Sequence, residues 1–122
     1  MAKLHIFVSA DKFHSAFALN DYLQPSYNAA GEVVASKFMK EIGLLGFEPM
    51  AIEASFKEKV ESVRKLIAGF PFEEAWSGLI EESLTANIAI AVYEPNIVSS
   101  PENAGIQYLG CYNYDDRVRE NS

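Results

Sequence analysis

Side chains that commonly carry catalysis are scarce in this sequence. Its 122 residues include one cysteine and two histidines. The lone Cys111 cannot form an intramolecular disulfide, which is typical of a reducing compartment and predicts a cytoplasmic protein with a buried, inert thiol. His5 and His14 have no second histidine or cysteine at the spacing of a metal-ligand pair. We therefore expect no metal, no cofactor and no enzyme activity; a small enzyme with a spatially assembled His/carboxylate site is the alternative.

Long apolar runs and phosphate-binding glycine motifs are also missing. No stretch approaches the ~18 uninterrupted apolar residues of a membrane-spanning helix. The N-terminal apolar run ends at Asp11 and Lys12, which is too short for a secretory signal. None of the motifs G-x-G-x-x-G, G-x-x-x-x-G-K and G-x-S-x-G occurs. The sequence thus predicts a protein with neither a membrane-spanning helix nor a phosphate-binding glycine loop.

Acidic residues outnumber basic residues in this sequence. There are 10 Lys and Arg residues against 17 Asp and Glu residues, so the net charge is −7. Such a chain repels nucleic acid and anionic membranes and attracts basic partners at long range. Binding of a basic partner is therefore a better hypothesis than catalysis, and nucleic acid is not expected as a ligand.

The amino-acid composition is that of a protein with a packed core. Hydrophobic residues make up 49% of the chain and aromatic residues 12%, well away from disordered compositions. The length suits one globular domain, which we place at residues 1–122 with a charged and frayed C-terminal tail at 115–122. The periodicities predict strands at 4–8, 51–55, 87–93 and 106–114 and helices at 11–24, 36–42, 56–68 and 71–84.

This order, β-α-α-β-α-α-β-β, predicts an α+β two-layer domain in which helices pack on one face of a four-stranded, largely antiparallel sheet. The third helix rests on two signals. Ser55-Phe56-Lys57-Glu58 matches a capping box, and Phe56, Val60, Val63 and Ile67 keep the spacing of a buried helical stripe. Residues 25–35 look like a loop with Val33 and Val34 turned inward.

Two sets of side chains are candidates for partner binding. Tyr108, Tyr112 and Tyr114 would lie on one face of the last strand, with Gly110 leaving a gap among them. Aromatic residues on an uncovered sheet face are typical of interaction hot spots, although helices covering that face would bury them instead. The second set is the acidic fourth helix, and its members are Glu73, Glu74, Glu81 and Glu82. Trp76 in the same helix is expected in the core.

A family resemblance covers most of the chain. Its signals are Tyr22-x4-Tyr27-x3-Gly31-x4-Ser36-x-Phe38, the extended Ile52-Glu53-Ala54-Ser55-Phe56, Gly69-Phe70-Pro71-Phe72 and Tyr108-Leu109-Gly110. On these residues the chain resembles the immunity protein 22 family of bacterial polymorphic-toxin systems. Members often carry acidic residues before the glycine and in the turn before the second strand, where this chain has Ala29-Ala30 and Gly46-Phe47-Glu48-Pro49. Glu48 and Glu53 are the acidic positions that match.

The resemblance implies a small cytoplasmic protein that binds and blocks a cognate toxin domain, often a nuclease in such systems. An acidic surface that occupies a site meant for phosphates is a physically sensible way to do so. We therefore expect a partner-binding patch that combines Glu48 and Glu53 with Tyr108, Tyr112 and Tyr114. A general protein-interaction adaptor is the other alternative.

Overall fold

The computed structural model describes residues 2–45 and 48–114, so the predicted tail at 115–122 lies outside the described residues. The principal elements follow the predicted order β-α-α-β-α-α-β-β. They are β1 (Ala2–Ser9), α1 (Ala16–Leu23), α2 (Lys37–Glu41), β5 (Ile52–Ser62), α3 (Val63–Leu66), α4 (Glu73–Trp76), β6 (Thr85–Tyr93) and β8 (Gln107–Tyr114). Short elements lie between them: β2 (Ser26–Tyr27), β3 (Val33–Val34), β4 (Leu44–Leu45), β7 (Ile97–Val98) and the 3-10 turns Pro49–Ala51, Ser77–Leu79 and Pro101–Asn103.

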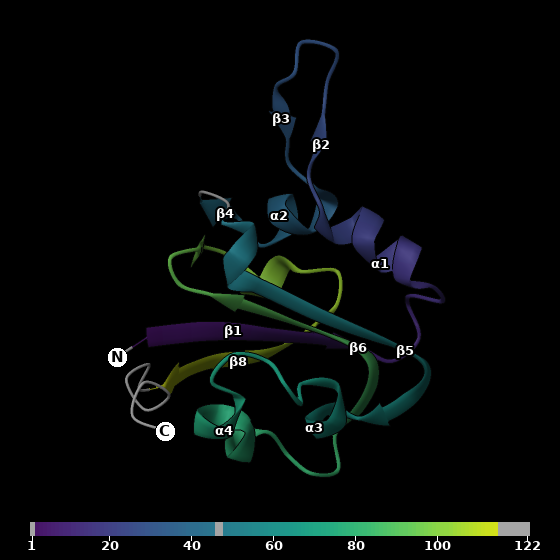
Figure 1. Cartoon of the computed structure of the whole chain (residues 1–122), viewed down its shortest axis with the longest axis vertical. Helices are drawn as coiled ribbons and strands as arrows, with labels where there is room; N and C mark the ends of the chain where they lie inside the picture. Colours follow the sequence, from purple (N-terminus) through teal and green to yellow (C-terminus); the bar gives the residue numbers. More distant parts are fainter. Residues whose placement is uncertain (1, 46–47, 115–122) are drawn as a thin grey trace.

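The main sheet is four-stranded and antiparallel, with the strand order β5-β6-β1-β8 (Figure 1). This confirms the predicted α+β class and the four-stranded sheet. β6 is an interior strand, as its apolar run predicts, and only Thr85 at its start is exposed. β5 and β8 form the two edges of the sheet.

Helices cover both faces of this sheet rather than one, with α1 and α2 on one side and α3 and α4 on the other (Figure 1). Side chains alternate between the faces along a strand, and β1 is buried on both. The first face joins strand residues Leu4, Ile6, Val8, Ala89 and Ala91 to Val63, Leu66, Ile67, Trp76 and Ile80. The second joins Phe7, Ile88, Ile90 and Val92 to Phe13, Leu19, Tyr22, Leu23, Phe38 and Ile42. Trp76 lies in the core as predicted, at 1% exposure.

The third helix is much shorter than predicted, because β5 continues to Ser62. β5 pairs with β6 from Ile52 to Phe56 and again at Glu61 and Ser62, with an irregularity between. The side chain of Asn87 on β6 donates to the Lys57 carbonyl at 3.3 Å and so holds this irregular stretch. Val63 and Ile67 are buried, but Val60 is 48% exposed, so the helical stripe does not exist as predicted.

The other helices also differ from the predictions in length. α1 begins at Ala16 rather than near residue 11, because Ser15 is its N-cap and accepts from the Ala18 amide at 3.0 Å. The fourth helix is a single turn followed by a 3-10 turn, and Leu79 is 64% exposed. α2 is as predicted: Ser36 caps it, and Gly43 follows it with a φ of +62°.

Candidate partner-binding surface

The five residues predicted to bind a partner do not form one patch. Glu53 lies on the edge strand β5, and Tyr108, Tyr112 and Tyr114 lie on β8 at the opposite edge. β6 and β1 separate these two edges. With about 4.8 Å between neighbouring strands, the edge backbones are about 14 Å apart. Glu48 precedes the 3-10 turn Pro49–Ala51. The role of each residue in binding stays a prediction.

A β-bulge also divides the three tyrosines. Ile6 of β1 pairs with Gly110 and Phe7 pairs with Tyr108, so Leu109 is an extra residue in β8. One extra residue moves every side chain beyond it to the other face of the sheet. Tyr108 therefore lies on the α1/α2 side, whereas Tyr112 lies on the α3/α4 side. The prediction that the tyrosines share a face is wrong, and Gly110, with a φ of +146°, is the signal that marks the bulge.

The tyrosines also differ in burial. Tyr114 is 6% exposed and belongs to the core cluster under α3 and α4, where it makes edge-to-face contact with Tyr93. Tyr112 is half-buried beside the same cluster, and burial raises the pKa of its hydroxyl. Tyr114 is thus mainly a core residue, and Tyr112 presents only part of its ring to a partner.

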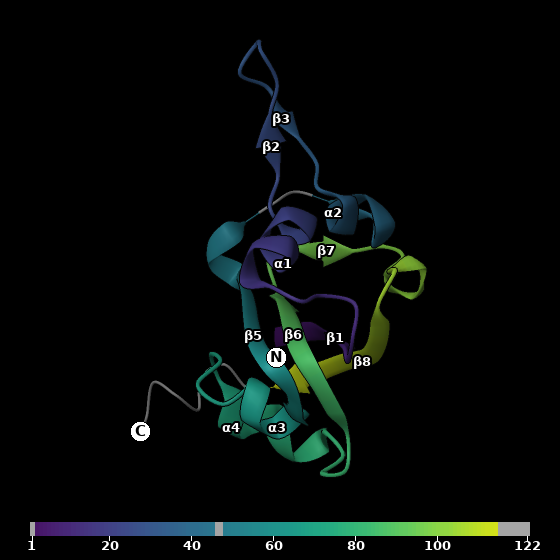
Figure 2. The same ribbon diagram turned by 90° about the vertical axis from the view of Figure 1, so that its right-hand side faces the viewer.

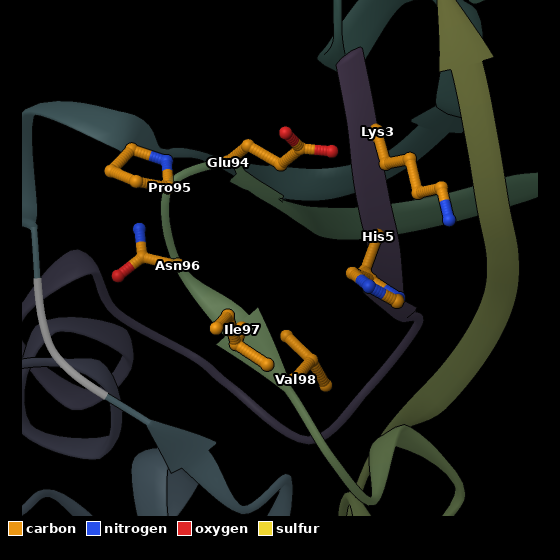
Figure 3. A pocket seen from close by; sticks show the side chains of 7 residues that line it. All are labelled: Lys3, His5, Glu94, Pro95, Asn96, Ile97 and Val98. Carbon is orange, nitrogen blue, oxygen red and sulfur yellow. The ribbon is translucent and has the colours of Figure 1, made fainter. Parts of the chain in front are cut away.

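Tyr108 is hydrogen-bonded to His5, which lines a hollow of about 390 Å³ between β1 and the segment 94–98. Figure 3 shows the lining side chains: Lys3, His5, Glu94, Pro95, Asn96, Ile97 and Val98. His5 Nδ1 and the Tyr108 hydroxyl are hydrogen-bonded at 2.8 Å. Burial first, and Lys3 second, lower the pKa of His5, while burial chiefly raises the pKa of Tyr108 to about 12. Both groups are therefore neutral near pH 7.

Glu48 is linked to the same hollow by hydrogen bonds to Asn96, one of its lining residues. The Asn96 amide accepts from the Glu48 backbone N–H at 2.9 Å and donates to the Glu48 carbonyl at 3.1 Å. The Glu48 carboxylate accepts from the Met50 backbone N–H at 3.1 Å. Of the predicted residues, Glu48 and Tyr108 are thus associated with one concave feature. Glu53 faces the α3/α4 side, because it pairs with Ala91 of that face.

The alternative acidic surface lies around α4 and the following 3-10 turn. Glu74, Glu81 and Glu82 are exposed there, and Glu73 is half-buried. Glu82 forms an ion pair with Arg64 at 3.1 Å, and Arg64 also donates to the Ile80 carbonyl at 2.9 Å. Glu82 therefore helps to hold the turn against α3, whereas Glu74 and Glu81 face solvent.

Among residues 2–45 and 48–114, no group of three His, Cys, Asp or Glu side chains is placed to hold a metal ion. Over the same residues, no helix combines the length and apolar character needed to cross a membrane. Within residues 2–45 and 48–114, the hydrogen-bond partner of His5 is Tyr108 rather than a carboxylate, and the ion pair joins Arg64 to Glu82. Cys111 is exposed on β8 rather than buried as predicted.

The feature that sequence reasoning missed is a projecting hairpin made of β2 and β3 (Figures 1 and 2). All residues from 26 to 34 are exposed, including the Val33 and Val34 that were predicted to turn inward. The turn residues Asn28 and Gly31 were a usable hairpin signal, because they lie between the strand-forming Tyr27 and the β-branched pair Val33-Val34. Each strand has only two residues, which is why the periodicity did not reveal them.

The structure thus combines an acidic α+β domain, a shallow hollow and an exposed hairpin, which is a set of features suited to protein recognition. Comparison with protein-family models matches residues 6–115 to the family described as Immunity protein 22. The chain therefore belongs to the Immunity protein 22 family. Searches of curated proteins and of solved structures find no significant match.

Proposed function

We propose that this protein is a stoichiometric inhibitor that binds one cognate toxin domain and blocks its activity. The observation that carries the proposal is the family match over residues 6–115. The cell in question is a bacterium with a polymorphic-toxin system, and the inhibitor acts in its cytoplasm. The toxin domain is basic, and a nuclease is the class we favour.

The charge of the chain supports a basic partner. A net charge of −7 accelerates encounter with a positively charged surface and disfavours binding of nucleic acid itself. Nuclease clefts carry positive charge because they bind phosphates, so an acidic protein can compete for them. Glu48 and Tyr108 are each hydrogen-bonded to a residue that lines the hollow, and we retain these two predicted residues together as contacts. The acidic turn around Glu81 is the second surface.

Coexpression and direct binding test the proposal. The toxin domain encoded beside the gene for this chain should kill cells when expressed alone and should be harmless when the two are expressed together. Calorimetry with a catalytically inactive toxin variant should give a 1:1 complex. Continued killing in the presence of folded, abundant inhibitor would contradict the proposal.

The enzyme alternative has little geometric support. A general base needs an orienting partner within hydrogen-bond reach, and the partner of His5 is the phenol of Tyr108. His14 is exposed on the segment before α1. The adaptor alternative differs from the toxin inhibitor in its partner, and the coexpression assay separates the two.

A further inference from the structure

The β2–β3 hairpin exposes apolar side chains that folding does not explain. Tyr27 and Val33 are paired across the hairpin, and they are 69% and 60% exposed. Paired residues point to the same side of a two-stranded ribbon, so these two side chains form one small apolar face. Burial of apolar area is what stabilises a fold, and an isolated hairpin of this size gains little from it. The apolar face is thus available to another molecule.

The tip of the hairpin is fixed by its own hydrogen bonds. The Asn28 side-chain oxygen accepts from the Ala30 amide at 2.9 Å and from the Glu32 amide at 3.0 Å. The backbone closes the turn with bonds from Gly31 to Asn28 and from Asn28 to Glu32, both at 3.0 Å. Gly31 has a φ of +80°, which glycine adopts without strain. A turn that is already ordered loses little conformational entropy on binding.

The base of the hairpin is fixed as well. α1 ends at Leu23 just before it, α2 begins at Lys37 just after it, and the Tyr22 hydroxyl of α1 donates to the Glu41 carboxylate of α2. The same carboxylate accepts from the Gly105 amide at 2.8 Å. These bonds join the two helices to each other and to the segment before β8. The hairpin is therefore presented at a set angle.

We propose that the β2–β3 hairpin enters the active-site cleft of the toxin domain; this inference rests on the proposed function. A narrow convex element fits a concave site, and ligand-binding clefts combine apolar walls with a few polar or charged groups. The tip consists of the small residues Ala29, Ala30 and Gly31, and the apolar pair Tyr27 and Val33 lies behind it. These side chains would pack against the cleft walls.

Charge complementarity selects the cleft over other surfaces. Glu32 is the only charged side chain between residues 26 and 34, and the chain as a whole carries −7. A hairpin with one carboxylate next to its tip suits a cleft that holds positive charge for an anionic substrate. Inhibition should therefore be competitive with the toxin's own substrate.

The test measures affinity for the inactive toxin domain by calorimetry. Tyr27→Thr combined with Val33→Thr keeps strand-forming residues and removes the apolar face, and should weaken binding about 10- to 100-fold. Val60→Thr is the matched control, because Val60 is 48% exposed and lies on β5, outside both the hairpin and the contact surfaces retained above. The control should bind like the wild type, and circular dichroism should show both variants folded.

A second variant tests insertion of the tip itself. Ala30→Trp keeps Tyr27 and Val33 but widens the tip, so it should lose binding and inhibition by a similar factor. If both hairpin variants bind and inhibit like the wild type, the inference is overturned while the proposed function stands. If the wild type itself does not bind the toxin, both fall. A wild-type dimer that Tyr27→Thr with Val33→Thr converts to a monomer would assign the hairpin to a second copy of this chain and overturn the inference.

Discussion

At the scale of single residues, Tyr22 has the clearest structural role outside the sheet. Its hydroxyl donates to Glu41, and burial first and Glu41 second raise its pKa above the ordinary value. Tyr22→Phe should lower the free energy of unfolding by about 1–3 kcal/mol, because the hydrogen bond to a charged group is lost. Urea denaturation measures this change.

The matched control is Tyr27→Phe, which removes the same hydroxyl from an exposed ring. It should change the free energy of unfolding by less than about 0.5 kcal/mol. Equal losses in the two variants would mean that the Tyr22–Glu41 bond contributes nothing specific to stability.

His5 should make stability depend on pH on the acidic side of neutrality. Its pKa in the folded state lies below 6.5. The unfolded chain therefore binds the proton first as pH falls, so the contribution of His5 is complete above about pH 6.5 and is lost as pH falls toward the folded pKa. Unfolding free energies near pH 7.5 and near pH 5 should differ less in His5→Gln than in the wild type. The control His14→Gln alters an exposed side chain and should keep the wild-type difference.

At the scale of elements, β5 gives a prediction that separates the observed strand from the expected helix. In the helix, Val60 and Val63 would both face the core, whereas in the structure Val63 is buried and Val60 is 48% exposed. Val63→Asp should therefore cost on the order of several kcal/mol, because it buries a charge. Val60→Asp should cost less than about 1 kcal/mol. A large loss of stability from both, seen in thermal unfolding, would contradict the strand.

Two of the predicted helices, one confirmed and one replaced by a strand, show why only part of the fold was predictable. Local signals suffice for α2, because the Ser36 cap and Gly43 fix both of its ends. The stretch from Phe56 to Ser62 has an equally good local signal for a helix, yet it belongs to β5 and pairs with β6 at both of its ends. Pairing with a buried strand across about thirty residues is a tertiary effect that overrides local propensity.

The site was less predictable than the fold for a related reason. The bulge at Leu109 and Gly110 places Tyr108 and Tyr112 on opposite faces. Strict alternation of side chains along β8 would place both tyrosines on one face, and Gly110 is the one residue of the sequence that indicates a bulge. The proximity of Glu48 to the hollow depends on its bonds to Asn96, which is 48 residues away in the chain. The spacing of apolar residues along the chain carries no information about such long-range contacts.

At the scale of the whole molecule, the net charge of −7 predicts salt-dependent association. The association rate with the inactive toxin domain should fall by about 10-fold or more between low and high salt, because screening removes long-range steering. The dissociation rate should change much less. Surface plasmon resonance over a salt series measures both rates, and an association rate independent of salt would contradict an electropositive partner surface.

The arrangement of layers was deducible in part. The apolar run of β6 predicts a strand buried on both faces, and that observation already calls for cover on both sides of the sheet. The predicted two-layer domain has helices on one face only, which conflicts with this expectation for β6. With α1 and α2 on one side and α3 and α4 on the other, both faces of the sheet are covered, and the β2–β3 hairpin projects away from both packed layers (Figure 1).

The separation of the hairpin from the core bears on how this protein can change over generations. Its side chains fill no part of either packed layer, so their replacement leaves the folded state almost unaffected. Lineages can thus accumulate new residues between positions 26 and 34 without losing a folded chain. An inhibitor that must follow a changing toxin is able to diversify there first, while its scaffold stays constant.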